Sequence, residues 1–578
     1  MRILFLTHSF NSLTQRLHAE LTARGHEISV EFDIADSVAK EAVDLFRPDL
    51  ILAPYLRRAI PESIWKKHLC LVVHPGIVGD RGPSALDWAI LEDESEWGVT
   101  VIQANGEMDA GAIWADETFP MRQATKASLY RNEVTEAACR AVLTAVERVQ
   151  DGRFVPLPLS DAINARGTLR PLMRQADRAI DWQRDNSAKV LAKLRAADGF
   201  PGVADLMFGE ACHLFDGRAE GTLRGGPNTK PGDIIGRRET ALLRATVDGA
   251  VWIGHVKRSG QGQEGVVKLP AALAFPEQAA ALPELPLPDG WAAEDETWQD
   301  IRYREADDVG FLDFDFYNGA MGTAQCRRLL EAFRWATARP TKVLVLMGGA
   351  DFWSNGIHLN LIEAALDSQG SPADESWANI NAMDDLAEAV IRCESHFTVA
   401  AMQGNAGAGG CFLARACDRL WLRDGMLLNP HYKNMGNLYG SEYWTYLLPP
   451  RVGEEGAAAI MKNRLPLTAL AAVQCGFADA RLAGEPAAFR ADVACRAAEL
   501  AADSPRLLAE KAERRRRDEA AKPLNHYREE ELVKMRRNFY GFDPSYHVAR
   551  YHFVRKSPSS WTPRHLALHR NPGWSVPG

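Results

Sequence analysis

The chain has 578 residues, which suggests about four compact units at roughly 150 residues each. Hydrophobic residues make up 46% and charged residues 25%, an ordinary globular composition, and the net charge of −9 argues against a protein that coats nucleic acid. The nine Cys include no C-x-x-C pair, which argues against a zinc ribbon or a disulfide framework and favours a reducing compartment. Because we find no signal-peptide pattern and no run of about 18 apolar residues, we expect a soluble, cytoplasmic protein that binds neither membranes nor nucleic acid and holds no metal.

Short apolar strands alternate with amphipathic helices over residues 1–160. Strands are predicted at 3–6, 27–32, 50–53 and 70–73. Such alternation predicts crossover connections and a parallel, Rossmann-like sheet whose carboxyl edge holds the ligand crevice. The first strand is followed by THSFNSL and not by G-x-G-x-x-G, so nothing supports a dinucleotide site.

The rest of the chain changes character three times. Short strands separated by Gly predict a small β-barrel over residues 161–273, and the Pro-, Ala- and acid-rich segment 274–298 reads as a linker. A second α/β region follows over residues 299–504. The tail, residues 505–578, is predicted to be helical and then aromatic-rich, and we favour its packing within the chain over its docking to a partner. The fold class is therefore α/β and multidomain.

One His and one Asp mark a candidate site in the first region. His74 directly follows the predicted strand CLVV, and Asp109 lies in a turn between Gly106 and Gly111. A His held beside a carboxylate can stabilise an oxyanion. From spacing alone, however, a surface His and an ordinary turn Asp are the default explanation.

The segments LVVHPGIVGDRGPSALDWAI and GVTVIQANGEMDAG resemble the formyltransferases that act on methionyl-tRNA and glycinamide ribonucleotide. His74, the Arg81-Gly82 pair and Asp109 match the motif of that family. Val72 stands where the family has an Asn that helps to bind the formyl oxygen. Loss of one oxyanion donor costs roughly 10²–10³ in rate, so Val72 indicates either a dead site or one adapted to another acceptor, such as a thiol.

The same resemblance implies the formyl donor. The segment APYLRRAIP (53–61) looks like the family's folate-binding loop, which puts Leu56, Arg57 and Arg58 beside a bound 10-formyltetrahydrofolate. The predicted barrel likewise resembles the accessory C-terminal domain of the methionyl-tRNA enzyme.

The segments 350–365 and 400–425 resemble the enoyl-CoA hydratase/isomerase (crotonase) superfamily. In that family two backbone N–H groups polarise the thioester carbonyl of a coenzyme A substrate, and the matching positions here are Ile357 and Gly409. Phe412 occupies the place of the first catalytic Glu, and the second is also missing from its usual place. Addition of water to a double bond is therefore not expected.

The segment LNPHYKNMGNLYGSEYW (428–444) stands where the second carboxylate belongs, and it offers Tyr432 and Glu442. A Tyr–Glu pair can transfer protons if burial raises the pKa of the Glu. The alternative is a Tyr packed at a domain edge and a Glu in solvent.

A formyl-folate site followed by an acyl-CoA site resembles one family over nearly the whole chain: the hydrogenase maturation factors HypX and HoxX. The resemblance implies that formyl moves from 10-formyltetrahydrofolate to coenzyme A and that formyl-CoA is then split into CO and CoA, with the CO serving the nickel–iron hydrogenase site. Hydrogenase maturation proteins that receive the CO would be partners. In this scheme His74 and Asp109 act in transfer and Tyr432 and Glu442 in CO release. A formyl-folate hydrolase, a formyl-amine transferase and a non-catalytic maturation scaffold stay open as alternatives.

Overall fold

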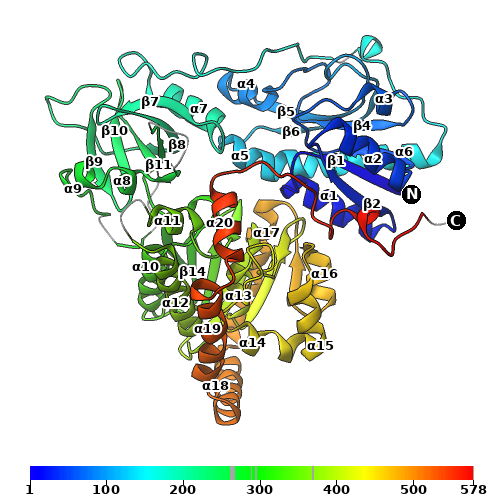
Figure 1. The fold of residues 1–578 in the computed structure, drawn as a ribbon. Helices are drawn as coiled ribbons and strands as arrows, with labels where there is room; N and C mark the ends of the chain where they lie inside the picture. Colours follow the sequence, from blue (N-terminus) through cyan, green and yellow to red (C-terminus); the bar gives the residue numbers. More distant parts are fainter. Residues whose placement is uncertain (164, 261–266, 288–289, 293–295, 367–369, 577–578) are drawn as a thin grey trace.

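The structure is a computed structural model that describes residues 1–163, 165–260, 267–287, 290–292, 296–366 and 370–576. It contains an N-terminal domain (2–151), a middle domain (187–280), a C-terminal domain (301–502) and a tail (504–576). Figure 1 shows the N-terminal and middle domains side by side above the C-terminal domain, with the tail helices along the latter. No helix in this described part of the chain is long and apolar enough to cross a membrane.

The N-terminal domain is built on a six-stranded sheet in the order β2-β1-β3-β4-β5-β6. Its strands are β1 (Arg2–Thr7), β2 (Glu27–Phe32), β3 (Leu50–Ala53), β4 (Cys70–His74), β5 (Glu96–Gln103) and β6 (Ile113–Pro120). The first four are parallel, as expected, whereas β5 and β6 run antiparallel to their neighbours. A short turn joins β5 to β6, which only an antiparallel pair permits.

Helices cover this sheet on both faces. They are α1 (Ser12–Ala23), α2 (Asp36–Phe46), α3 (Glu62–Trp65), α4 (Ala85–Leu91), α5 (Lys126–Leu129), the π-helical turn η1 (Tyr130–Val134) and α6 (Thr135–Asp151). Leu13, Leu17 and Leu21 of α1 are buried, so the apolar stripe seen in the sequence faces the core.

The middle domain is an antiparallel sheet in the order β7-β8-β11-β10-β9. Its elements are α7 (Ser187–Ala197), β7 (Val203–Met207), β8 (Glu210–Glu220), β9 (Ile234–Arg238), β10 (Ala241–Ala245), β11 (Ala250–Arg258), β12 (Leu269–Pro270), α8 (Ala271–Ala274) and α9 (Pro276–Ala280). Among the strands described, no β7–β9 pairing closes this sheet into a barrel. The predicted linker 274–298 contains α9 and runs along β9, where Arg237 N–H donates to Pro283 O at 3.0 Å.

The C-terminal domain contains two sheets. Strands β13 (Ile301–Ala306), β14 (Val309–Phe314), β15 (Val343–Gly348), β17 (Phe397–Met402), β19 (Arg419–Arg423) and β22 (Ala480–Leu482) form the larger sheet in that order, and β16 (Phe352–Ser354), β18 (Asn405–Gly407), β20 (Leu427–Asn429) and β21 (Leu467–Thr468) form the smaller one. The helices are α10 (Thr323–Ala336), α11 (Leu359–Ala364), α12 (Pro372–Ile391), α13 (Gly409–Arg415), α14 (Trp444–Leu447), α15 (Pro449–Lys462), α16 (Ala469–Gln474) and α17 (Pro486–Ala502). The loops that follow the small strands carry the predicted site residues.

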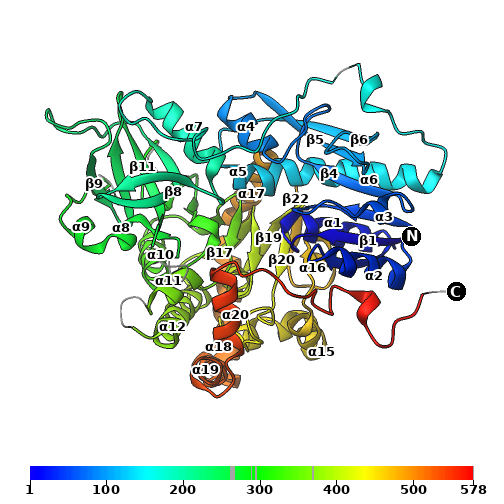
Figure 2. The ribbon, with the colours of Figure 1, turned by 45° about the horizontal axis from the view of Figure 1, so that its top comes forward.

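The tail contacts both ends of the molecule. Its helices α18 (Ser504–Ala521), α19 (Leu524–Tyr540) and α20 (Ser545–Val554) lie against the C-terminal domain, where Phe539 and Tyr546 join the buried core. The chain then runs as an extended strap (residues 555–576) to the N-terminal domain, as Figures 1 and 2 show. There the N–H of Val30 donates to Leu566 O at 2.9 Å, so the strap covers the exposed edge of β2.

Candidate functional site

His74 and Asp109 meet at the carboxyl end of the N-terminal sheet. His74 is the last residue of β4, and Asp109 lies in the β5–β6 turn with a left-handed φ of 52°. The Nδ1 atom of His74 lies 3.5 Å from Oδ2 of Asp109. The same carboxylate oxygen accepts the N–H of Gly82 at 3.1 Å, so the loop after β4 holds the acid in place.

A second carboxylate, which the sequence reasoning missed, lies closer to this His. Nε2 of His74 is 2.8 Å from Oδ2 of Asp80, and both side chains are buried. The close approach needs Gly76, because a methyl group there would lie 2.4 Å from Nε2 of His74. In the sequence, Asp80 lies in a Gly-Asp-Arg-Gly loop, five residues before α4 begins at Ala85. That position in a Gly-rich loop after a strand was the signal that could have identified it.

The predicted folate loop follows β3, the neighbour of β4. Asp33 accepts the N–H groups of Arg57 at 3.1 Å and Arg58 at 3.3 Å, which fixes the loop beside Leu56. Val72 pairs with Ala53 of β3 and is partly exposed, so the side chain at the usual Asn position is an apolar one on the same sheet.

In the C-terminal domain the two predicted oxyanion positions lie next to each other. Gly356 precedes Ile357, and a methyl group on Gly356 would lie 3.6 Å from the N atom of Gly409. Gly409 is the first residue of α13, so its N–H lies in the turn whose donors have no partner within the helix.

Glu442 lies directly against this position. A methyl group on Gly409 would be 2.2 Å from Oε1 of Glu442, so only glycine leaves room for the carboxyl group. The hydroxyl of Tyr432 donates to Oε2 of Glu442 at 2.5 Å, and both residues are buried. The structure therefore brings Gly409, Tyr432 and Glu442 together.

The environment shifts the proton affinity of this pair. Burial, and after it the negative charge of Asp384, raise the pKa of Glu442 to about 8, although hydrogen bonds from Tyr432 and Ser441 lower it in part. Burial also raises the pKa of Tyr432 well above its ordinary value, and the Glu442 carboxylate adds to this shift. A carboxyl group with such a pKa binds and releases protons near neutral pH.

Phe412, predicted to stand where the hydratases have a Glu, packs beside Tyr432. Its ring stacks on that of Tyr432 with an interplanar angle of 7° and a centroid distance of 6.0 Å. The residue is fully buried. The apolar replacement therefore supports the Tyr that contacts Glu442.

Sequence reasoning also missed two acids that hold the Glu442 loop. Asp384 of α12 accepts the N–H of Glu442 at 2.8 Å, and Glu531 of α19 accepts that of Tyr443 at 2.9 Å. Each acid interrupts an apolar helical stripe, for example Glu531 with Met535 and Phe539 at i, i+4 and i+8. That interruption was the signal for a buried carboxylate.

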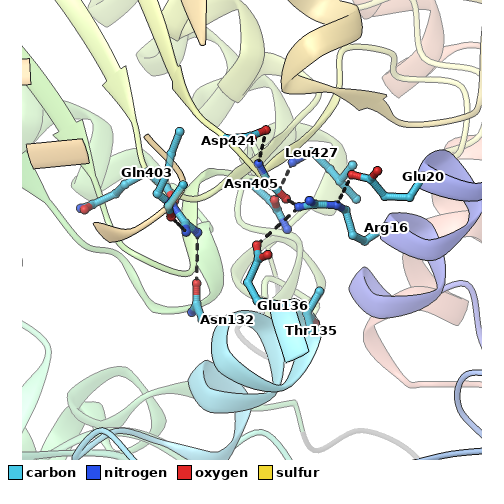
Figure 3. A network of polar contacts seen from close by, with 12 residues as sticks. Arg16, Glu20, Asn132, Thr135, Glu136, Gln403, Asn405, Asp424 and Leu427 are labelled. Carbon is cyan, nitrogen blue, oxygen red and sulfur yellow. Dashed lines mark hydrogen bonds and ion pairs between the residues drawn. The ribbon is translucent and has the colours of Figure 1, made fainter. Parts of the chain in front are cut away.

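Polar contacts join the N-terminal and C-terminal domains at their interface (Figure 3). Arg16 of α1 lies 3.5 Å from Glu136 of α6 and also donates to Gly425 O across the interface. Nearby, Asn429 donates to Oε1 of Gln15 at 3.2 Å and accepts the N–H of Ala408, the residue before Gly409, at 2.9 Å. Within the described residues, no hydrogen bond or ion pair directly joins the His74 group to the Glu442 group.

Comparisons with known proteins cover the whole chain. Sequence models match residues 2–146 (formyl transferase), 172–266 (formyl transferase, C-terminal domain) and 318–563 (enoyl-CoA hydratase/isomerase). The hydrogenase maturation factor HoxX of Bradyrhizobium diazoefficiens is 54% identical over 572 residues, which are 99% of this chain and 97% of that protein. The methionyl-tRNA formyltransferase of Halalkalibacterium halodurans is 24% identical over 40% of this chain and 72% of its own.

A solved structure agrees over the same length. The crystal structure of HypX from Aquifex aeolicus in complex with tetrahydrofolic acid is 46% identical, covers 100% of both chains and superposes with a TM-score of 0.94. These findings confirm the expected fold class: an α/β multidomain chain with a formyltransferase-type sheet domain, a crotonase-type domain and a helical tail.

Proposed function

Because the chain belongs to the HypX/HoxX family of hydrogenase maturation factors, we propose that it makes carbon monoxide in two steps. In the first step, formyl passes from 10-formyltetrahydrofolate to the thiol of coenzyme A, which gives tetrahydrofolate and formyl-CoA. In the second step, formyl-CoA splits into CO and CoA: the C–H and C–S bonds of the formyl carbon break and an S–H bond forms. The contact of Glu442 with both Gly409 and Tyr432 is the observation that carries the proposal.

His74 is the residue proposed for the first step. It stabilises the negative charge that develops on the formyl oxygen as the thiolate adds, and Asp80 and Asp109 hold its ring on both sides. The loop Leu56–Arg58 lies beside this group at the same sheet edge and is proposed to hold the folate. Val72 leaves His74 without the usual amide donor, which suits a thiolate, a stronger nucleophile at neutral pH than most amines.

Glu442 and Tyr432 are proposed for the second step. The close backbone approach at Gly356 and Gly409 fits a thioester, whose carbonyl oxygen would accept the N–H groups of Ile357 and Gly409. Glu442 removes the formyl proton, and Tyr432 protonates the departing sulfur. Glu442 then returns the proton to the Tyr432 oxygen through the 2.5 Å hydrogen bond between them, so the proton count balances.

Anaerobic incubation of the purified protein with 10-formyltetrahydrofolate and CoA tests the proposal, with CO trapped on reduced haemoglobin. CO should require both substrates. The variant His74→Ala should lose CO formation from this mixture and keep it from supplied formyl-CoA, whereas Glu442→Gln should form formyl-CoA and release no CO.

Other products identify the alternatives. Formate without a need for CoA would indicate a formyl-folate hydrolase, and a formylated amine an amine transferase. If the wild-type protein consumes neither substrate but both variants still support hydrogenase maturation, the chain acts as a scaffold and the proposal is wrong.

A further inference from the structure

The segment 439–443, which carries Glu442, lies outside regular helices and strands and is held by side chains of other elements. Helix α19 of the tail contributes several of them. Asn538 Oδ1 accepts the N–H of Tyr439 at 3.0 Å, and Met535 Sδ lies 3.2 Å from the N of Gly440. The tail therefore forms one wall of the candidate site, although it is far away in the sequence.

Two buried carboxylates bind the most strained part of this segment. Glu442 and Tyr443 adopt left-handed φ angles of 58° and 60°, which are unfavourable for residues with a Cβ atom. Asp384 accepts the N–H of Glu442, and Glu531 accepts those of Tyr443 at 2.9 Å and Thr445 at 2.8 Å. Two strained residues in succession persist only where their surroundings fix them, and here each has its own carboxylate.

Burial makes these acids costly unless they have a purpose. Asp384 and Glu531 are each 1% exposed. Asp384 has only a distant cation, Arg528 at 3.9 Å, and among the described residues no ion pair involves Glu531. Burial raises the pKa of Glu531 well above its ordinary value, which again reflects a carboxyl group without a close cation. An amide or an apolar residue would avoid this cost, so stability alone does not explain the acids.

We propose that Asp384 of α12 and Glu531 of α19 are positioning residues that hold the Ser441–Thr445 backbone so that the Glu442 carboxyl group lies between Gly409 and Tyr432. Asp384 binds both the N–H of Glu442 and the hydroxyl of Ser441, the latter at 2.6 Å. Glu531 accepts the N–H of Tyr443, the residue that follows Glu442, and so holds the segment on the C-terminal side of Glu442. The inference rests on the proposed role of Glu442 in CO release.

The charge of Asp384 has a separate consequence, since it raises the proton affinity of Glu442. The titratable and charged groups around Glu442 come from every packed element: Asp384 (α12), Tyr432 (its own loop), Cys326 (α10), Cys411 (α13), and Glu531 and Arg528 (α19). Among these, Asp384 is the acid whose removal lowers the pKa of Glu442 most directly.

Variants of Glu531 test positioning. With supplied formyl-CoA, Glu531→Ala should lower kcat for CO release on the order of 10²-fold, because a misplaced acid loses the reactive geometry. Glu531→Gln keeps one carbonyl acceptor and should lose about tenfold. KM should stay within about twofold in both, because substrate contacts are unchanged.

Glu220→Gln in β8 is the matched control. Glu220 is also a buried carboxylate, and it accepts the N–H groups of Thr222 at 2.9 Å and Leu223 at 3.0 Å far from Glu442. It should lower the thermal unfolding temperature and leave kcat unchanged. If the Glu531 variants lose only thermal stability, as this control does, positioning is refuted.

The dependence of kcat on pH in Asp384→Asn tests the charge effect, because loss of a purely structural contact would not shift it. The amide keeps an acceptor for Glu442 and Ser441 but removes the charge, so the rising limb of kcat against pH should move to lower pH. Asp384→Ala should in addition lose kcat. If the rising limb of kcat in Asp384→Asn stays at the wild-type pH, the proposed charge effect is wrong.

Different results would contradict the proposed function and the positioning role of Asp384 and Glu531. If wild-type protein releases no CO from formyl-CoA, the proposed function is wrong. If it does so and Glu442→Gln does not, but the Asp384 and Glu531 variants match wild type, the proposed function stands and the positioning inference is wrong.

Discussion

The N-terminal and C-terminal candidate sites hold their carboxylates in different environments. His74 lies between two carboxylates that are held by hydrogen bonds, at an edge where Asp109 stays partly exposed. Glu442 instead is buried next to Tyr432, on which Phe412 stacks, and the charge of Asp384 raises its pKa. The first environment suits groups that stabilise a developing charge, and the second suits a group that binds and releases a proton.

Both sites share one device, a glycine beneath the reactive group. Gly76 leaves room for His74 and Asp80, and Gly409 leaves room for Glu442. The difference lies in what surrounds them. At the N-terminal site His74 contacts two carboxylates, Asp80 and Asp109. At the C-terminal site Phe412, which stands where the resemblance to the hydratases puts a Glu, stacks its ring on Tyr432, and Tyr432 donates to Glu442.

The largest expected effect comes from putting a Glu at position 412. Phe412→Glu puts a carboxylate into a fully buried position and breaks the ring stack on Tyr432. We expect a loss of about 3–5 kcal/mol in the free energy of unfolding, the usual result of removing a buried Phe, and a loss of CO release on the order of 10²-fold. Denaturant unfolding and CO release from formyl-CoA measure the two. Phe412→Leu, which stays apolar, should lose less of both, and a Phe412→Glu variant with wild-type stability would contradict the assigned packing role.

At the other site, the distances rank the two acids. Asp80 lies 2.8 Å from Nε2 of His74, and Asp109 lies 3.5 Å from Nδ1. Asp80→Asn should therefore lower formyl transfer on the order of 10²-fold, the lower range for a group that acts in acid–base or oxyanion catalysis. Release of tetrahydrofolate in the presence of CoA measures the transfer, and CO release from supplied formyl-CoA should not change. A loss in the second reaction would show that the two sites are not separate.

The pH dependence should distinguish the two reactions within one enzyme. As the proposed base, Glu442 is active in its ionised form, and its raised pKa means that activity should be lost as the pH falls through about 8. Below that value kcat for CO release should fall by about tenfold per pH unit. Tetrahydrofolate release should not show this limb. A limb in the ordinary Glu range near pH 4.5 would place Glu442 in water.

Local sequence patterns predicted much of this arrangement. The formyltransferase motif pointed to His74 and Asp109 together, whereas their spacing alone favoured an ordinary surface His and turn Asp; the structure places Nδ1 of His74 3.5 Å from Oδ2 of Asp109. The Gly-rich loops likewise indicated Ile357 and Gly409. What made these residues predictable is that each lies on a motif whose geometry is set by a few adjacent residues.

The acids around these sites were not predictable in the same way. Asp384 and Glu531 contact the Glu442 loop across 58 and 88 positions. Only the packing of α12 and α19 on the same loop brings them together, and no local pattern records it. The antiparallel β5 and the strap on β2 are likewise set by tertiary pairing. The assigned roles of Tyr432 and Glu442 stay predictions.

The smallest expected effect concerns the connection between the sites. The strap closes on Glu31 of β2, which is buried and contacts Thr562, His569 at 3.0 Å and Arg570 at 2.6 Å. Glu31→Gln should lower the free energy of unfolding by about 1–3 kcal/mol, because buried donors lose a charged acceptor, and should speed proteolysis of residues 555–576.

Glu41→Gln is the control for the strap, because Glu41 pairs with the same Arg570 at 2.9 Å from an exposed position and should cost little. Each half-reaction should stay within about twofold of wild type in both variants. The yield of CO per formyl group transferred should fall only in Glu31→Gln. Helix α19 packs against the segment that carries Glu442, and the strap pairs with β2 of the sheet that carries His74. The same tail therefore contacts both domains. Loosening the strap should let formyl-CoA escape before either half-reaction slows. An unchanged yield would mean that the contacts of α1, α5 and η1 with the C-terminal domain hold the two domains in place without the strap.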